Sequence, residues 1–153
     1  MDAKWTARFI NLAAEVGSWS KDPSSQVGAV IIRPDRSVAS VGFNGLPRAV
    51  SDDPARLADR DQKLLYTVHA ELNAILAARE PLHGCSIVVY PFQPCAQCAA
   101  AIIQAGISEV ICPNNPVPST RSGDTSTAST RWADSFHAAR TMFREAGTVV
   151  RWV

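Results

Sequence analysis

The sequence predicts an α/β protein in which helices cover both faces of a single β-sheet. Short apolar runs of strand length alternate with amphipathic segments of helix length along the chain. This alternation is typical of a sheet sandwiched between its connecting helices. In the second half, a helix separates each apolar run from the next, which predicts parallel strands there. With 153 residues the chain can bury one core, so we expect one domain over residues 1–153.

The N-terminal part predicts a helix followed by two strands. Apolar residues recur at helical spacing and the helix is expected to end at Gly17; they are Trp5, Phe9, Leu12, Ala13 and Val16. The segments 26–33 (QVGAVIIR) and 37–43 (SVASVGF) predict two strands joined by a turn at Pro-Asp-Arg. The polar segment from Asn44 to about Lys63 predicts a loop with room for one helical turn near 55–61.

The remaining elements follow in regular alternation. A helix is predicted around 69–80 (HAELNAILAARE), stopping before Pro81, and the next around 95–106, with Gly106 as its C-terminal cap. Residues 113–131, rich in Pro, Ser and Thr, predict a mobile loop, and a last helix runs from Trp132 to about Gly147. Buried strands are expected at 84–90 (GCSIVVY) and 107–112 (ISEVIC), and a closing strand at 148–153 (TVVRWV).

Charge and composition favour a small ligand over a long polyanion. The net charge is +1 and acids and bases are mixed along the chain, without the basic stripe that long nucleic acids require. No segment approaches the run of about eighteen apolar residues typical of a membrane span. The N-terminal segment MDAKWTARFINLAAEV is charged where a secretory signal would be apolar. We therefore expect a cytoplasmic protein that binds neither membrane nor long nucleic acid.

The four cysteines fall into two groups. Cys85 and Cys112 lie in apolar strand segments and are expected to be small buried hydrophobes. Cys95 and Cys98 occur in PCAQC, at i and i+3 in the first turn of a predicted helix. They therefore share one helix face, and the helix dipole favours their thiolate forms. Taken alone, this pair is compatible with a metal site, a redox pair or a structural role.

His69 makes the metal site the favoured interpretation. It begins the preceding predicted helix, and one strand separates that helix from the CxxC helix. Consecutive crossovers in one sheet bring such helix starts side by side. One imidazole and two thiolates give three zinc ligands, as expected of a catalytic site whose fourth position holds water. We predict one Zn²⁺ per chain on His69, Cys95 and Cys98, with water in the fourth position.

Glu71 is the predicted catalytic residue. It lies two residues after His69, about 200° around an ideal helix, and is poorly placed to bind the same ion. In the first turn it can still face the cavity, take a proton from zinc-bound water and return it to a leaving group. An acid at a helix N-terminus is also stabilised by the helix dipole alone, but the three neighbouring ligands favour catalysis.

The pattern H-x-E followed by P-C-x-x-C resembles the zinc-dependent cytidine/deoxycytidylate deaminase superfamily. Successive blocks resemble the deoxycytidylate (dCMP) deaminases most closely; they are SKDPSSQVGAVII, GFNGLPR, HAELNAI, PCAQCAAAIIQAGISEV and AARTMFREAG. The resemblance covers most of the chain from Ser20 to Gly147. It implies a three-layer α/β/α sandwich around a five-stranded mixed sheet. It also implies hydrolytic conversion of dCMP to dUMP and ammonia.

The same resemblance implies the residues that contact the nucleotide substrate. Asn44 would hydrogen-bond the nucleotide, the backbone N–H of Ala70 would meet the base carbonyl, and Val27 would pack on the ring. Asn44 before Gly45 is also a good turn residue, and Val27 a good core residue. Lys21, Ser24 and Ser25 are candidates for the 5′-phosphate, although SKDPSS also predicts an ordinary turn between helix and strand. Arg48 and Arg140 are further candidates.

Two departures from the family pattern leave alternatives open. The loop 113–131 replaces a short acidic stretch that contains tyrosine, and PFQPC replaces the usual residues before the cysteine motif. The chain could therefore deaminate another small aminated base, nucleoside or nucleotide, or tRNA adenosine. A non-catalytic zinc-stabilised binding module and a Cys95–Cys98 redox pair are the alternatives from other classes. Because family members assemble, we also expect a homo-oligomer.

Overall fold

The computed structural model describes residues 1–115 and 127–153. Its centre is a five-stranded sheet of order β2-β1-β3-β4-β5. The strands are β1 (Gly28–Ile32), β2 (Val38–Phe43), β3 (Ser86–Tyr90), β4 (Glu109–Cys112) and β5 (Val149–Trp152). β1 runs antiparallel to both β2 and β3, whereas β3, β4 and β5 are parallel. The predicted mixed sheet with a late parallel section is confirmed.

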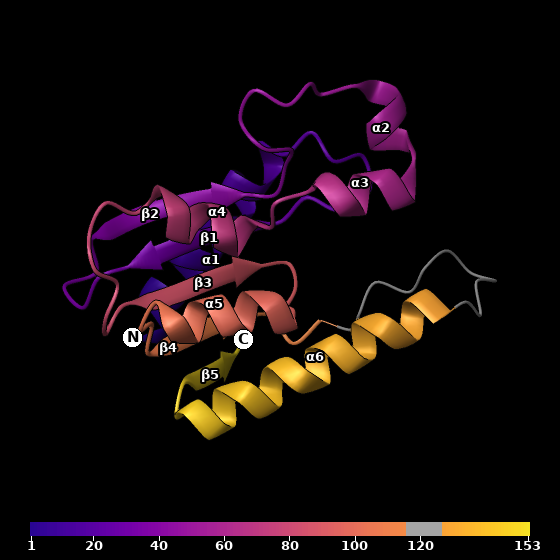
Figure 1. The fold of residues 1–153 in the computed structure, drawn as a ribbon. Helices are drawn as coiled ribbons and strands as arrows, with labels where there is room; N and C mark the ends of the chain where they lie inside the picture. Colours follow the sequence, from indigo (N-terminus) through magenta and orange to yellow (C-terminus); the bar gives the residue numbers. More distant parts are fainter. Residues whose placement is uncertain (116–126) are drawn as a thin grey trace.

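Helices cover both faces of this sheet and give three layers (Figure 1). The helix α1 (Ala3–Ser18) packs on one face, and α4 (Ala70–Ala77), α5 (Ala96–Gln104) and α6 (Thr127–Ala146) pack on the other. Every residue of β1 is buried. Val30 contributes to the core under α1 and Ile31 to the core under α4, because successive side chains of a strand point to opposite faces. The predicted three-layer α/β/α sandwich is therefore confirmed.

Glycines let two helices approach the sheet closely. A Cβ on Gly28 would lie 2.0 Å from the backbone oxygen of Ala13 in α1. A Cβ on Gly42 would lie 2.3 Å from the backbone nitrogen of Ala74 in α4. At these two positions only hydrogen fits between the backbones. The close contact at Gly42 fixes the height of α4 above the sheet.

The structure corrects three predicted segments. The expected loop 44–63 contains two short helices, α2 (Pro54–Ala58) and α3 (Arg60–Tyr66), capped by the carboxylates of Asp53 and Asp59. The helix predicted over 69–80 ends at Ala77, because Ala78 is already extended. α6 begins at Thr127, so the predicted loop 113–131 ends earlier, and residues 116–126 lie outside the described part. Among the described residues, no helix is both long and apolar enough to cross a membrane.

Candidate metal centre and its cavity

Two helix starts meet at one edge of the sheet. β2 and β3 point the same way, since both are antiparallel to β1, and the chain leaves both strands at the same edge before entering α4 and α5. His69 is the N-cap residue of α4 and Cys95 the N-cap residue of α5. Neither side chain caps its own helix by a hydrogen bond. Both are therefore free to face each other across the gap between the helices.

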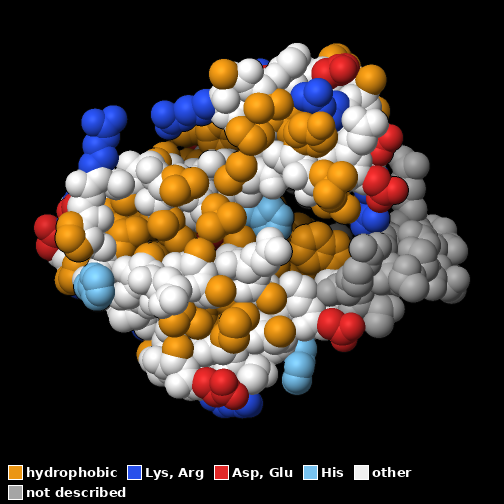
Figure 2. All heavy atoms as spheres, in the orientation of Figure 1, with side chains coloured by type: hydrophobic (Ala, Val, Ile, Leu, Met, Phe, Trp, Pro, Cys, Tyr) orange, Lys and Arg blue, Asp and Glu red, His pale blue; other side chains and the backbone are white. Residues whose placement is uncertain are grey.

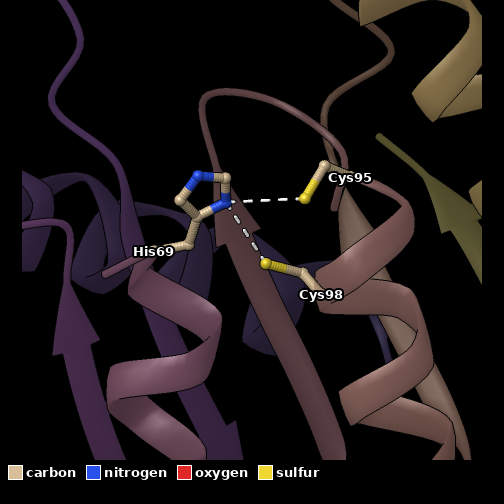
Figure 3. Close-up of side chains that lie close together, drawn as sticks. All are labelled: His69, Cys95 and Cys98. Atoms are coloured by element: carbon tan, nitrogen blue, oxygen red, sulfur yellow. Dashed lines mark hydrogen bonds between the residues drawn. The ribbon is translucent and has the colours of Figure 1, made fainter. Parts of the chain in front are cut away.

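The three predicted ligands converge there (Figure 3). The Nδ1 atom of His69 lies 3.5 Å from the Sγ atom of Cys95 and 3.4 Å from that of Cys98. The three candidate ligand atoms all lie within 4.8 Å of one another, and no fourth His, Cys, Asp or Glu of the described chain joins the group. Two sulfurs and one imidazole nitrogen match the donor set of a catalytic zinc site. The residues present therefore fit zinc.

The electrostatics of the group also suit a cation. A hydrogen bond from the Cys98 thiol, together with His69, outweighs the cost of burial and holds the pKa of Cys95 well below its usual range. The neighbouring Cys95 thiolate and burial raise the pKa of Cys98. The hydrogen bond to Cys95 raises the pKa of His69, against the effect of burial. One negative charge is thus shared by two thiols, and a divalent cation would displace the remaining proton.

Glu71 lies beside this group in the first turn of α4. Its side chain is buried, with 4% of the residue exposed, and it lines the same cavity as His69. Burial raises the pKa of this carboxyl group, and the positive charge of His69 only partly opposes the rise. A carboxyl group whose pKa is shifted toward neutrality can both accept and donate a proton.

A cavity of about 750 Å³ opens above the metal ligands. Figure 2 shows the hollow near the centre of this face, bordered largely by apolar side chains and backbone. Its walls come from segments far apart in the sequence; they are residues 22–27, Asn44, the α2–α3 segment, the start of α4, residues 92–95 and the N-terminal part of α6. The volume is sufficient for a nucleotide-sized ligand.

Two aromatic residues of α6 form one wall beside the metal ligands. The ring of Trp132 stacks against the imidazole of His69, with 6.4 Å between ring centroids and 27° between planes. Trp132 also packs on Phe136, with 5.8 Å between centroids. The sequence marked both residues only as the apolar face of the last helix. No signal in the sequence separated this face from an ordinary core stripe.

The comparisons with known proteins agree with this geometry. Residues 3–113 match the family of the cytidine and deoxycytidylate deaminase zinc-binding region. The chain belongs to this family. It is 48% identical over 153 residues to an uncharacterised deaminase in the luxG 3′ region of Aliivibrio fischeri, covering 100% of this chain and 96% of the relative.

One further relative and one solved structure resemble the chain. The human protein named deoxycytidylate deaminase is 39% identical over 154 aligned positions, covering 97% of this chain and 79% of the human one. The crystal structure of dCMP deaminase from the cyanophage S-TIM5 superposes with a TM-score of 0.71, covering 100% of both chains. Because that identity is 19%, the likeness shows the shared deaminase fold and nothing finer.

Asn44 holds the cavity wall of this deaminase family member in place. Its Oδ1 atom accepts a hydrogen bond from the backbone N–H of Val27, and its Nδ2 atom donates to the carbonyl of Ser25, both at 2.8 Å. Its neighbour Gly45 forms two backbone hydrogen bonds with Val68, of 3.1 and 2.8 Å. Asn44 and Val27 both line the cavity. Asn44 therefore holds the backbone of Ser25 and Val27 in place, and its contact with a substrate stays a prediction.

Ala70, the first residue of α4, lines the cavity. Its side chain is completely buried. The N–H groups in the first turn of a helix have no carbonyl partner within the helix, so the N–H of Ala70 can serve a ligand. This group directly follows His69 in the chain, and its expected contact with the base stays a prediction.

The three phosphate candidates occupy different environments. Ser24 and Ser25 line the cavity, but both backbone N–H groups donate to the Oδ1 atom of Asp22, at 2.8 and 3.0 Å. Lys21 does not line the cavity: its side chain is 70% exposed and pairs with Asp52. The structure thus brings the two serines, but not Lys21, to the site.

Lys63 is the cation that the sequence analysis missed. Its ammonium group lies 2.8 Å from Asp22, also contacts the hydroxyl of Ser24, and lines the cavity together with Arg60. The side chains of Lys63 and Asp22 are each only 8% exposed. A lysine in a polar segment ordinarily indicates a solvated surface, so the sequence carried no signal for this burial.

Proposed function

We propose that this chain converts dCMP to dUMP and ammonia. One observation carries this proposal: the candidate ligand atoms of His69, Cys95 and Cys98 lie within 4.8 Å of one another. The buried Glu71 lines the same nucleotide-sized cavity as His69 and Cys95. The name of the human relative supports the substrate. We propose His69, Cys95 and Cys98 as ligands of one zinc ion and Glu71 as the catalytic residue.

The chain's own residues divide the work of this hydrolysis. When bound, zinc supplies activated water at neutral pH by lowering its pKa to about 7. Glu71 takes a proton from the attacking water and passes it to ring nitrogen N3 as the C4–O bond forms. It then carries the remaining hydroxyl proton to the exocyclic nitrogen, so that the C4–N bond breaks, C4=O forms and neutral ammonia leaves. Its burial keeps bulk water from competing for that proton. We propose that the N–H of Ala70, at the start of α4, holds the base carbonyl.

The remaining walls are proposed to hold the ring and the sugar phosphate. Val27 packs on one side of the ring, with Asn44 keeping the backbone of Val27 in position. Since Asp22 occupies the N–H groups of Ser24 and Ser25, the 5′-phosphate is served by side chains instead. The hydroxyl of Ser25 and the cations of Lys63 and Arg60 line that part of the cavity.

A substrate panel tests the reaction. Zinc-loaded protein is incubated with dCMP, deoxycytidine, cytosine, guanine and adenosine, and ammonia is measured. We expect the highest kcat/KM with dCMP. No turnover of dCMP beside clear turnover of another compound would assign the chain to a different substrate.

Glu71→Gln tests the mechanism. The amide keeps the shape of the side chain but cannot carry the proton, so we expect turnover to fall by about three or more orders of magnitude with one zinc per chain retained. Glu145→Gln, an exposed change in α6, is the matched control and should keep wild-type turnover. If Glu71→Gln left the biological function of the protein intact, a non-catalytic zinc-stabilised module would be favoured. Metal-free protein with a reversible Cys95–Cys98 disulfide would favour a redox pair.

The organisation of the protein in the cell stays a prediction. We propose one deaminase domain over residues 1–153, homo-oligomeric assembly and a cytoplasmic location, as the sequence analysis expects. Sedimentation of the zinc-loaded protein tests the assembly, and fractionation of the source cells tests the location.

A further inference from the structure

Gln93 carries an unexplained polar group at the cavity wall. It is 8% exposed, lies two residues before Cys95 and lines the cavity. Its Nε2 atom is buried and has no hydrogen-bond partner among the described residues. The other such atom in the described part, Nε of Arg56, belongs to a residue that does not line the cavity. A buried amide donor without a partner is costly and rare, which calls for a missing acceptor.

The orientation of this amide is fixed by chemistry. The Nε–H of Arg140 donates to the Oε1 atom of Gln93 at 2.8 Å. Arg140 has only donors to offer, so a flipped amide would set NH₂ against a guanidinium group. The guanidinium is itself held over the ring of Trp152, 4.8 Å from its centroid. The oxygen of Gln93 therefore faces Arg140, and the NH₂ group remains for another partner.

We infer that Gln93 is a specificity-determining residue whose NH₂ group donates a hydrogen bond to an acceptor atom of the bound pyrimidine nucleotide. This inference rests on the proposed function. Pyrimidine rings offer acceptors, a ring nitrogen and a carbonyl oxygen in the aminated substrate and carbonyl oxygens in the product. Gln93 lines the same cavity as the candidate metal ligands His69 and Cys95.

Two substitutions separate recognition from a structural role. Gln93→Glu keeps the size and strengthens the contact with Arg140, but replaces the donor by an acceptor. Gln93→Met keeps the approximate size and removes both polar groups. For each variant we measure KM and kcat with dCMP, inhibition by dUMP and the melting temperature of the zinc-loaded protein.

If Gln93 binds the nucleotide, Gln93→Glu raises KM for dCMP and weakens dUMP inhibition by about thirtyfold or more, because a carboxylate repels the acceptor. Gln93→Met weakens both by about three- to tenfold, the value of one neutral hydrogen bond. The melting temperature only checks that each variant is folded, because Gln93→Met also removes the acceptor of Arg140.

If Gln93 only anchors Arg140, both variants keep the wild-type KM for dCMP and the wild-type inhibition by dUMP. That result overturns the inference. The proposed function fails separately, when wild-type protein does not turn over dCMP. In that case the same variants are measured with the compound of the panel that is turned over, and unchanged KM in both again refutes the role of Gln93.

Discussion

The buried ion pair between Asp22 and Lys63 gives the sharpest test of how the cavity wall is held. Both side chains are 8% exposed, whereas the surface pair of Lys21 and Asp52 is 70% and 42% exposed. In Asp22→Asn the amide oxygen can still accept the N–H groups of the following loop, but Lys63 keeps a buried charge without a counter-ion. Breaking a buried pair on one side costs about 3 kcal/mol. In a domain of this size that lowers the melting temperature by about 6–12 °C.

The assay is thermal unfolding of the single and double variants. Asp52→Asn is the matched control, and the loss of an exposed pair should cost less than about 1 kcal/mol. The double variant Asp22→Asn/Lys63→Met removes both charges and should recover to within about 1 kcal/mol of wild type, because a neutral pair needs no compensation. The reasoning is refuted if Asp22→Asn melts like Asp52→Asn. It is also refuted if the stability losses of the single variants Asp22→Asn and Lys63→Met simply add in the double variant.

The pH dependence of the same pair has a defined sign. Burial alone would raise the pKa of Asp22, but the ammonium of Lys63 and the N–H groups of Ser24 and Ser25 outweigh it and hold the pKa below its usual value. A depressed pKa in the folded state contributes stability above the unfolded pKa of about 3.9, and this is lost as pH falls toward the folded value. The difference in melting temperature between wild type and Asp22→Asn should therefore shrink from pH 7 to about pH 3.

Two further predictions concern the metal centre. Gly42→Ala places a Cβ 2.3 Å from the backbone of Ala74, so α4 must move and carry His69 with it. We expect the free energy of unfolding to fall by about 3 kcal/mol or more and zinc to be retained less tightly. An unchanged free energy of unfolding would contradict the packing of α4 on Gly42. Removal of zinc with a chelator at neutral pH should abolish ammonia release and lower the melting temperature, because the ligand atoms at the starts of α4 and α5 lose the ion that they share. Re-addition of zinc should restore both the activity and the melting temperature. Turnover without metal would disprove the assignment of a zinc site.

The main elements could be predicted because local patterns encode them. The fully buried β1 appears in the sequence as an uninterrupted apolar run, and α1 as a helical stripe. The strand order could not be derived from residues alone, since the pairing of β1 with β3 joins segments far apart in the chain. One helical turn was expected near 55–61, where α2 lies, but two separate helices were not predicted, because α2 buries no residue and α3 buries only Lys63. A helix without an apolar stripe cannot be recognised from the hydrophobic periodicity of its sequence.

The metal ligands could likewise be predicted from local patterns, whereas the other residues of the cavity wall could not. His69, Cys95 and Cys98 were predicted together because helix starts and one intervening strand fix their relation. The roles of Lys63 and Trp132 depend on contacts across the cavity with Asp22 and His69. Such contacts arise only when separate segments meet. Family resemblance named positions around them but could not show which hydrogen bonds the chain already uses internally.

The paired backbone of Gly45 and Val68 has a consequence for altering this protein. The two hydrogen bonds close residues 46–67 into a loop whose ends are fastened just before His69. This loop carries α2 and α3 outward from the sheet (Figure 1) and contributes Leu57, Arg60, Lys63 and Leu64 to the cavity. The loop can therefore be exchanged as a unit. A replacement of different length or composition between Gly45 and Val68 would change ligand selectivity while the imidazole of His69 stays in place.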